Sequence, residues 1–384
     1  METMEEIELT LGASGDVPTH VINILNRLGL LTITGGAIPS SIDSHVVLAI
    51  RSFQQARGLT VNGVVNSMTL RALEEARWKL GDRSLLLQKA PLMRGDDVAT
   101  LQSRLTEMGF DCGRVDGVYG LRTEDAVKEF QKSVGVAVDG RCGAATITAL
   151  MRLTRTVSGG APAILRESAV QKNRGPSLAN KIIVLDPSCG GSDLGILGNG
   201  CTESEIVYDI AQRLEGRLLA LGVSVFLTRG LANSPSELER ITFSNETKAD
   251  LIVSFHTDNY RNEKAHGVAT YYYGSGAHGI HSVVGERFAS LVQREICART
   301  DLANCRTHAK TWDLLRLTKS PTVRIDVGYL SHPGDAERLT RPDFRDVIAE
   351  AVVIAIQRLY LSSEDDAKTG TLRIADLRKA GLRR

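Results

Sequence analysis

The sequence lacks an excess of charge of either sign. Its 384 residues carry 46 Lys and Arg against 45 Asp and Glu, and the two kinds are interleaved along the chain. A protein that binds nucleic acid through its phosphates needs a broad basic surface, which this composition does not supply. We therefore expect no nucleic-acid partner.

Long apolar runs are missing as well. No stretch approaches the roughly 18 residues of a membrane-spanning helix, and residues 1–8 are acidic where a signal peptide would be basic. The six cysteines form no CxxC motif, which is typical of reduced thiols, although Cys189 could pair with Cys201 and Cys297 with Cys305. The sequence thus predicts a cytoplasmic protein without a membrane span.

What the sequence does contain is an internal repeat. The segment 49–58 reappears at 126–135, so that Gln54 matches Gln131, and the Asn-Gly and Asp-Gly pairs that follow also match. The unit is duplicated at a spacing of roughly eighty residues. Within each copy, apolar residues recur every three or four positions, which predicts amphipathic helices joined by glycine turns.

The second copy resembles the three-helix peptidoglycan-binding module found on cell-wall hydrolases. The residues that carry this resemblance are Gly95-Asp96, Val115 to Gly120, Thr123, Phe130-Gln131 and Asp139-Gly140. The first copy is looser, with Ile42-Asp43-Ser44 where the Asp-Gly turn would fall. The resemblance implies two small modules, at residues 1–80 and 81–153. The fold alone would require the same residues, so binding of peptidoglycan is left open.

The helical period stops at residues 154–180, where segments rich in Gly and Pro predict a linker. A β-branched run at 181–186 follows, and further apolar strands at 223–227 and 251–255 alternate with helical patterns. Such alternation predicts an α/β sheet with helices on both faces, over residues 181–361. The expected fold class is therefore multidomain, with two helical modules followed by an α/β domain.

Four polar segments follow predicted strands, at the edge where open α/β sheets place their sites. They are Asp186 to Gly191, Cys201 to Glu205, Ser254 to Asp258 and Arg324 to Ser331. In order and spacing they resemble the zinc-dependent N-acetylmuramoyl-L-alanine amidase family. That resemblance implies a zinc ion held by His, Glu and His, and a second glutamate as general base. Together these cleave the amide between muramic acid and L-alanine.

Carried onto this sequence, the family pattern places Glu203 and His256 at two metal positions, with Glu205 as the alternative to Glu203. The first metal position, a histidine in the family, is Cys189, and the general-base position is Asp326. A thiolate can bind zinc but donates more charge, which weakens the acidification of bound water. Asp is one methylene shorter than Glu, which displaces the base by roughly 1 Å.

These two changes predict a site that hydrolyses weakly or not at all and in which zinc binding is doubtful. Either residue could also be structural, because a cysteine after a strand is often a small buried residue and an aspartate there often caps a helix. Substitute ligands would have to come from histidines that we expect at the surface. They are His266, His278, His281, His308 and His332.

Residues 362–384 change from acidic to basic, which predicts a charged tail. The tail could simply be a solvated chain end. Thr369 and Thr371 are nevertheless candidate phosphorylation sites, since a phosphate near the arginines that follow could switch a partner interface.

The domain order and the altered positions together resemble actinobacterial amidase-like regulators of peptidoglycan precursor synthesis. The resemblance implies a pseudoenzyme that acts through protein contacts, with the enolpyruvyl transferase of the first committed step as partner and a Ser/Thr kinase acting on the chain. Two alternatives stay open: an active zinc-dependent amidase, and a non-catalytic protein that binds muropeptide or cell wall.

Overall fold

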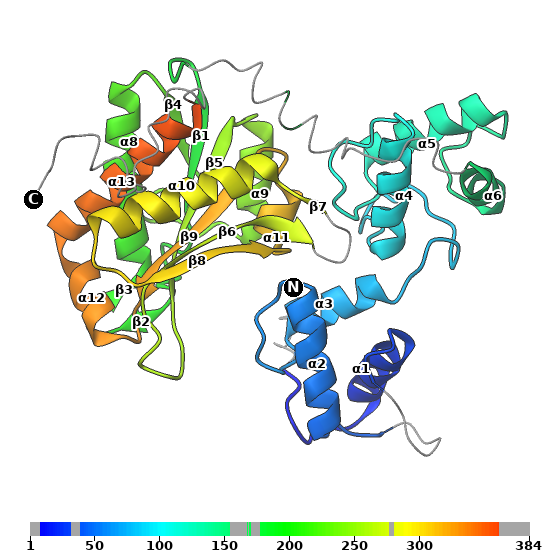
Figure 1. Ribbon diagram of the computed structural model, residues 1–384, viewed down its shortest axis with the longest axis horizontal. Helices are drawn as coiled ribbons and strands as arrows, with labels where there is room; N and C mark the ends of the chain where they lie inside the picture. The colour runs from blue at the N-terminus through cyan, green and yellow to red at the C-terminus, as the bar shows by residue number, and fades with distance from the viewer. Residues whose placement is uncertain are drawn as a thin grey trace, which may run out of the picture.

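The structure is a computed structural model that describes residues 8–31, 39–153, 167, 169, 177–275 and 280–360. Two helical modules and an α/β domain follow one another along the chain (Figure 1). Among the described residues, no helix has the length and apolar character needed to cross a membrane.

Each helical module consists of three helices around its own apolar core. The first contains α1 (Asp16–Arg27), α2 (Ser44–Ala56) and α3 (Ser67–Ala76), and the second contains α4 (Asp96–Glu107), α5 (Leu121–Val134) and α6 (Ala144–Arg152). Phe53 and Phe130, which are equivalent in the repeat, are both buried in these cores. The helical modules predicted from the repeat are therefore confirmed.

The repeated glutamine has a structural role that the sequence pattern did not reveal. Gln54, Gln102 and Gln131 are each 1% exposed, and each is followed by a glycine turn. In all three, the side-chain oxygen accepts two N–H groups of that turn. The side-chain nitrogen donates to a carbonyl of the turn and to a threonine hydroxyl. Each turn is thus held against a helix by one buried amide.

The α/β domain is built on a seven-stranded mixed sheet with the order β4-β1-β5-β9-β6-β7, in which β8 also pairs with β6. Strands β4, β1, β5 and β9 are parallel, and β6 runs antiparallel to β9. The strands are β1 (Ile182–Pro187), β4 (Ser224–Leu227), β5 (Leu251–Asp258), β6 (Val268–Ser275), β7 (Ile280–His281), β8 (Asn304–Lys310) and β9 (Thr322–Tyr329); a separate hairpin is formed by β2 (Leu197–Gly198) and β3 (Cys201–Thr202).

Helices cover both faces of this sheet, as the alternating pattern predicts. Helices α8 (Glu203–Ala220), α10 (Val283–Arg299) and α13 (Pro342–Tyr360) form the large core with one face, and α12 (Pro333–Thr340) packs beside them. Helices α9 (Glu237–Glu246) and α11 (Asp313–Leu317) lie beside each other. On this other face Arg240 of α9 reaches Asp186 of β1. Asp186 and its partners Arg240 and Ser254 therefore lie on this second face.

Helix α8 begins at Glu203, directly after the β2–β3 hairpin. The hydroxyl of Thr202 accepts the N–H of Glu205 and so caps the helix at Glu203. All six cysteines are free, so neither of the two pairs considered from the sequence is joined by a disulfide.

Candidate active site

The sequence-predicted residues lie at the carboxyl ends of neighbouring parallel strands. His256 on β5 is the register partner of Asp326 on β9, and Cys189 follows β1. Glu203 is the first residue of α8, and its carboxylate lies 3.5 Å from Nδ1 of His256. The structure therefore brings these four residues to one edge of the sheet.

The carboxylate of Glu203 is 5% exposed and is surrounded by donors. Its Oε1 accepts hydrogen bonds from the Ser188 hydroxyl at 2.9 Å and from the Thr257 N–H at 3.2 Å, and its Oε2 accepts the Ile196 N–H at 3.1 Å. Burial alone would raise the pKa of this carboxyl, but His256 and these donors outweigh it and lower the pKa to about 2. The Glu203 carboxyl is thus ionised at neutral pH, and both of its oxygens accept hydrogen bonds.

Cys189 is 6% exposed and lies against a tight turn. Burial, with the nearby charge of Glu203, raises the pKa of its thiol to about 11, so the sulfur is protonated at neutral pH. Gly195 faces it with φ +65°, and a side-chain carbon there would stand 2.3 Å from Sγ and 2.7 Å from Oε2 of Glu203. Glycine is required at this position because the space and the backbone conformation exclude a side chain.

His256 is tied into a network beneath the site. Ser254 donates to Asp186 at 2.6 Å, and the oxygen of Ser254 lies 3.1 Å from Nε2 of His256, while Nδ1 of the same ring faces Glu203. Burial, followed by the charge of Arg324, lowers the pKa of His256. Asp186 itself is fully buried and binds Arg240 through both oxygens, at 2.8 and 2.6 Å.

Asp326, at the general-base position, is 3% exposed and is bound by Arg324 on the same strand. Nε of Arg324 donates to Oδ1 at 2.6 Å and Nη2 donates to Oδ2 at 3.2 Å. The guanidinium is covered by the ring of Trp312, whose centroid is 4.6 Å away. Both oxygens of the carboxylate are therefore engaged by a cation.

The donors as arranged do not fit a zinc ion. Zinc needs three side chains whose free lone pairs converge on one point. Here Nδ1 of His256 faces the Glu203 carboxylate at 3.5 Å, both oxygens of that carboxylate accept hydrogen bonds from the protein, and the first metal position holds a protonated cysteine. Within the part of the chain that the structure describes, no group of three His, Cys, Asp or Glu side chains is placed to hold a metal ion.

The remaining histidines make contacts elsewhere in the domain. His266 stacks on His332 with ring centroids 4.8 Å apart, His281 lies 3.3 Å from Glu286, and His308 contacts the Cys305 carbonyl. The other residues considered from the sequence, His278, Thr369 and Thr371, lie outside the described residues.

Sequence reasoning included Arg324 in one of the four polar segments but gave it no role, and it missed Trp312. A signal for Arg324 was present, because it lies two residues from Asp326 on β9 and so shares a face with it. Trp312 reaches the site only through the packing of a loop, for which no local pattern exists.

Comparison with known proteins agrees with this architecture. Residues 183–358 match the N-acetylmuramoyl-L-alanine amidase family, and residues 19–73 and 94–150 each match a peptidoglycan binding domain. The chain is 43% identical over 380 residues to the N-acetylmuramoyl-L-alanine amidase CwlM of Mycobacterium tuberculosis, which covers 96% of this chain and 93% of that protein. It is 29% identical over 205 residues to the germination-specific N-acetylmuramoyl-L-alanine amidase of Bacillus subtilis, over 49% of this chain and 83% of that one.

A similar solved structure is the N-acetylmuramoyl-L-alanine amidase AmiC2 of Nostoc punctiforme. It is 26% identical with a TM-score of 0.42, over 46% of this chain and 94% of that chain. The motifs at the strand ends, the sheet that carries them and the similarity to CwlM along nearly the whole length lead to one conclusion. The chain belongs to the N-acetylmuramoyl-L-alanine amidase family.

Proposed function

We propose that this chain is a non-hydrolytic member of the amidase family that regulates peptidoglycan biosynthesis through protein contacts. The observation that carries the proposal is the pair formed by Arg324 and Asp326. A general base must offer a free oxygen to the water that it deprotonates. Here the carboxylate is buried and both oxygens already accept from the guanidinium.

The neighbouring donors support the same proposal. A zinc ion in this family would be the group that acidifies the water, and three ligands would hold it. Here the hydroxyl of Ser188 donates hydrogen bonds to Cys189 and Glu203, and His256 is hydrogen-bonded to Ser254. Each residue of the proposed vestigial site thus has a structural role that does not require a metal.

The regulatory part of the proposal rests on the resemblance to amidase-like regulators. The partner would be an enzyme of peptidoglycan precursor synthesis such as the enolpyruvyl transferase, in the cytoplasm, where six free cysteines would remain reduced. A Ser/Thr kinase acting on Thr369 or Thr371 would set the strength of this contact.

A second candidate function is the binding of muropeptide or cell wall without cleavage. It is favoured by the match of residues 19–73 and 94–150 to peptidoglycan binding domains. Sedimentation of the full chain with isolated cell walls tests this function. A protein that binds the wall is found in the pellet, whereas a protein that only contacts other proteins stays in the supernatant.

The first experiment is to measure the zinc content of the purified chain together with peptidoglycan hydrolysis, with and without added zinc. We expect no release of peptides that begin with L-alanine under either condition. Stoichiometric zinc with specific cleavage at the muramoyl-alanine bond would overturn the proposal and leave an active amidase with a Cys-Glu-His site.

A further inference from the structure

The helical modules contact the segment that covers Arg324. We infer that the docked modules fix Trp312 over Arg324 through α11, and so keep Arg324 on Asp326. This inference deepens the proposed function and rests on it, since the contact matters only if Arg324 keeps the Asp326 carboxylate from acting as a base. It makes the modules part of the site's regulation, in addition to any partner that they bind.

The first contact comes from the turn that follows α2. The hydroxyl of Thr311 donates to the carbonyl of Arg57 at 2.6 Å. Gly58 in this turn has φ +63°, and a side-chain carbon there would lie 3.1 Å from the Ala309 carbonyl oxygen. The turn therefore packs directly against the chain at the end of β8, immediately before Trp312.

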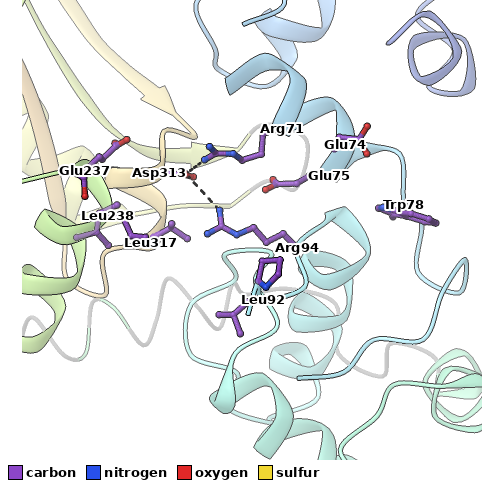
Figure 2. A pocket seen from close by; sticks show the side chains of 13 residues that line it. Arg71, Glu74, Glu75, Trp78, Leu92, Arg94, Glu237, Leu238, Asp313 and Leu317 are labelled. Carbon is purple, nitrogen blue, oxygen red and sulfur yellow. Dashed lines mark hydrogen bonds and ion pairs between the residues drawn. The ribbon is translucent and has the colours of Figure 1, made fainter. Parts of the chain in front are cut away.

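The second contact is electrostatic and joins α3 to α11. Arg316 binds both oxygens of Glu75 at 2.7 and 3.0 Å, and the two side chains are only 12% and 13% exposed. Arg71 from the first module and Arg94 from the second both reach Asp313, as Figure 2 shows at the wall of a cavity of about 620 Å³. Loss of one partner of the shielded Glu75–Arg316 pair would leave a poorly hydrated charge.

The second module holds the other end of α11. Nη1 of Arg114 donates to the carbonyls of Leu315 and Thr318, at 3.1 and 2.7 Å. Its guanidinium lies 4.4 Å from the ring centroid of Tyr273. A helix of five residues has few hydrogen bonds of its own, so these outside donors account for much of its order.

Trp312 lies between these contacts. It is the residue that precedes α11, so module contacts occur on both sides of it in the chain. Its ring faces the guanidinium of Arg324 and lies 4.8 Å from the ring of Tyr271. The ring keeps water from the guanidinium, and a drier ion pair is a stronger one. Release of α11 would therefore loosen the hold of Arg324 on Asp326.

The chain has only two tryptophans, Trp78 and Trp312, which allows a direct test. In full-length Trp78→Phe protein, Trp312 is the sole reporter for acrylamide quenching, and phenylglyoxal labelling followed by peptide mapping reports access to Arg324. Glu75→Lys places a cation against Arg316. Glu74→Lys is the matched control, because Glu74 is the adjacent residue and pairs with Arg77 and His20 of its own module.

We expect Glu75→Lys to raise both the quenching constant and the labelling rate at least twofold, and Glu74→Lys to leave them at parental values. Thr311→Val, which changes no charge, should give a smaller rise in the same direction, and it serves if Glu75→Lys does not fold. Parental values in both Glu75→Lys and Thr311→Val would overturn the inference. The hydrolysis assay on the unmodified chain tests the proposed function separately, so failure of one is distinguishable from failure of the other.

Discussion

Arg324 and Asp326 lie two residues apart on β9 and point to the same face of the sheet, where the guanidinium binds both carboxylate oxygens. Alternate residues of a strand always share a face, so the strand itself sets this pairing. Asp326 keeps the charge that a general base needs but has a permanent cationic partner.

The first prediction concerns recovery of hydrolysis. The double variant that combines Cys189→His and Asp326→Glu should remain inactive even with added zinc, because Arg324 still faces the new carboxylate. Adding Arg324→Leu should raise muramoyl-alanine cleavage by about a hundredfold or more, the usual contribution of a general base. The release of L-alanine-led peptides measures it.

The matched control for this series is Arg341→Leu. Arg341 forms the same kind of pair with Asp343, two residues away, but at the exposed start of α13. It should add nothing to the double variant. If the double variant already equals the triple variant, Arg324 does not restrain the base.

The second prediction concerns stability. Asp186→Asn should lower the free energy of unfolding by about 3–5 kcal/mol, because it leaves Arg240 charged and buried without its partner. Urea denaturation checks this, with Asp343→Asn as an exposed control that should leave the midpoint unchanged. Equal midpoints for the two variants would contradict a structural role for Asp186.

The third prediction concerns acid. The pKa of Glu203 is lowered from 4.5 to about 2 in the folded chain, so its contribution to stability is fully present above about pH 4.5 and is lost as the pH falls toward 2. The difference in unfolding free energy between the unmodified chain and Glu203→Gln should therefore shrink over this window by roughly 3 kcal/mol. A difference that stays constant with pH would show that the carboxylate is not stabilised by its donors.

The fourth prediction concerns the glutamine that holds the turn of the first module. Gln54→Leu should destabilise this module by about 1–3 kcal/mol, because the buried N–H of Gly63 loses its acceptor. Amide hydrogen exchange at Asn62 and Gly63 should accelerate. Gln55→Leu, one residue along on the exposed side of α2, should leave that exchange unchanged.

The sequence predicts the modules and the sheet because their signals are local. A helical period, a glycine turn or a β-branched run needs only neighbouring residues, and Gly117 and Gly140 have positive φ where the turns are expected. The meeting of Cys189, Glu203, His256 and Asp326 was an expectation from family resemblance, and the structure places them at one edge.

What the sequence did not predict depends on distant contacts. Arg316 and Glu75 are far apart in the chain, and nothing in either segment indicates its partner. The glutamines were recognised as a repeat, but their role needs the three-dimensional path of the turn. The engagement of Asp326 could have been inferred from strand alternation alone, because Arg324 is its neighbour on the same face.

The network around Asp186 has a consequence for the history of such a site. Asp186 holds Arg240, Thr228 and Ser254 below the residues at the strand ends, so the support of this sheet edge does not depend on catalytic chemistry. A lineage could therefore exchange the residues above it one at a time while the domain continued to fold. Hydrolysis could disappear long before the surface that partners recognise, and the retained shape could then be selected for a different task.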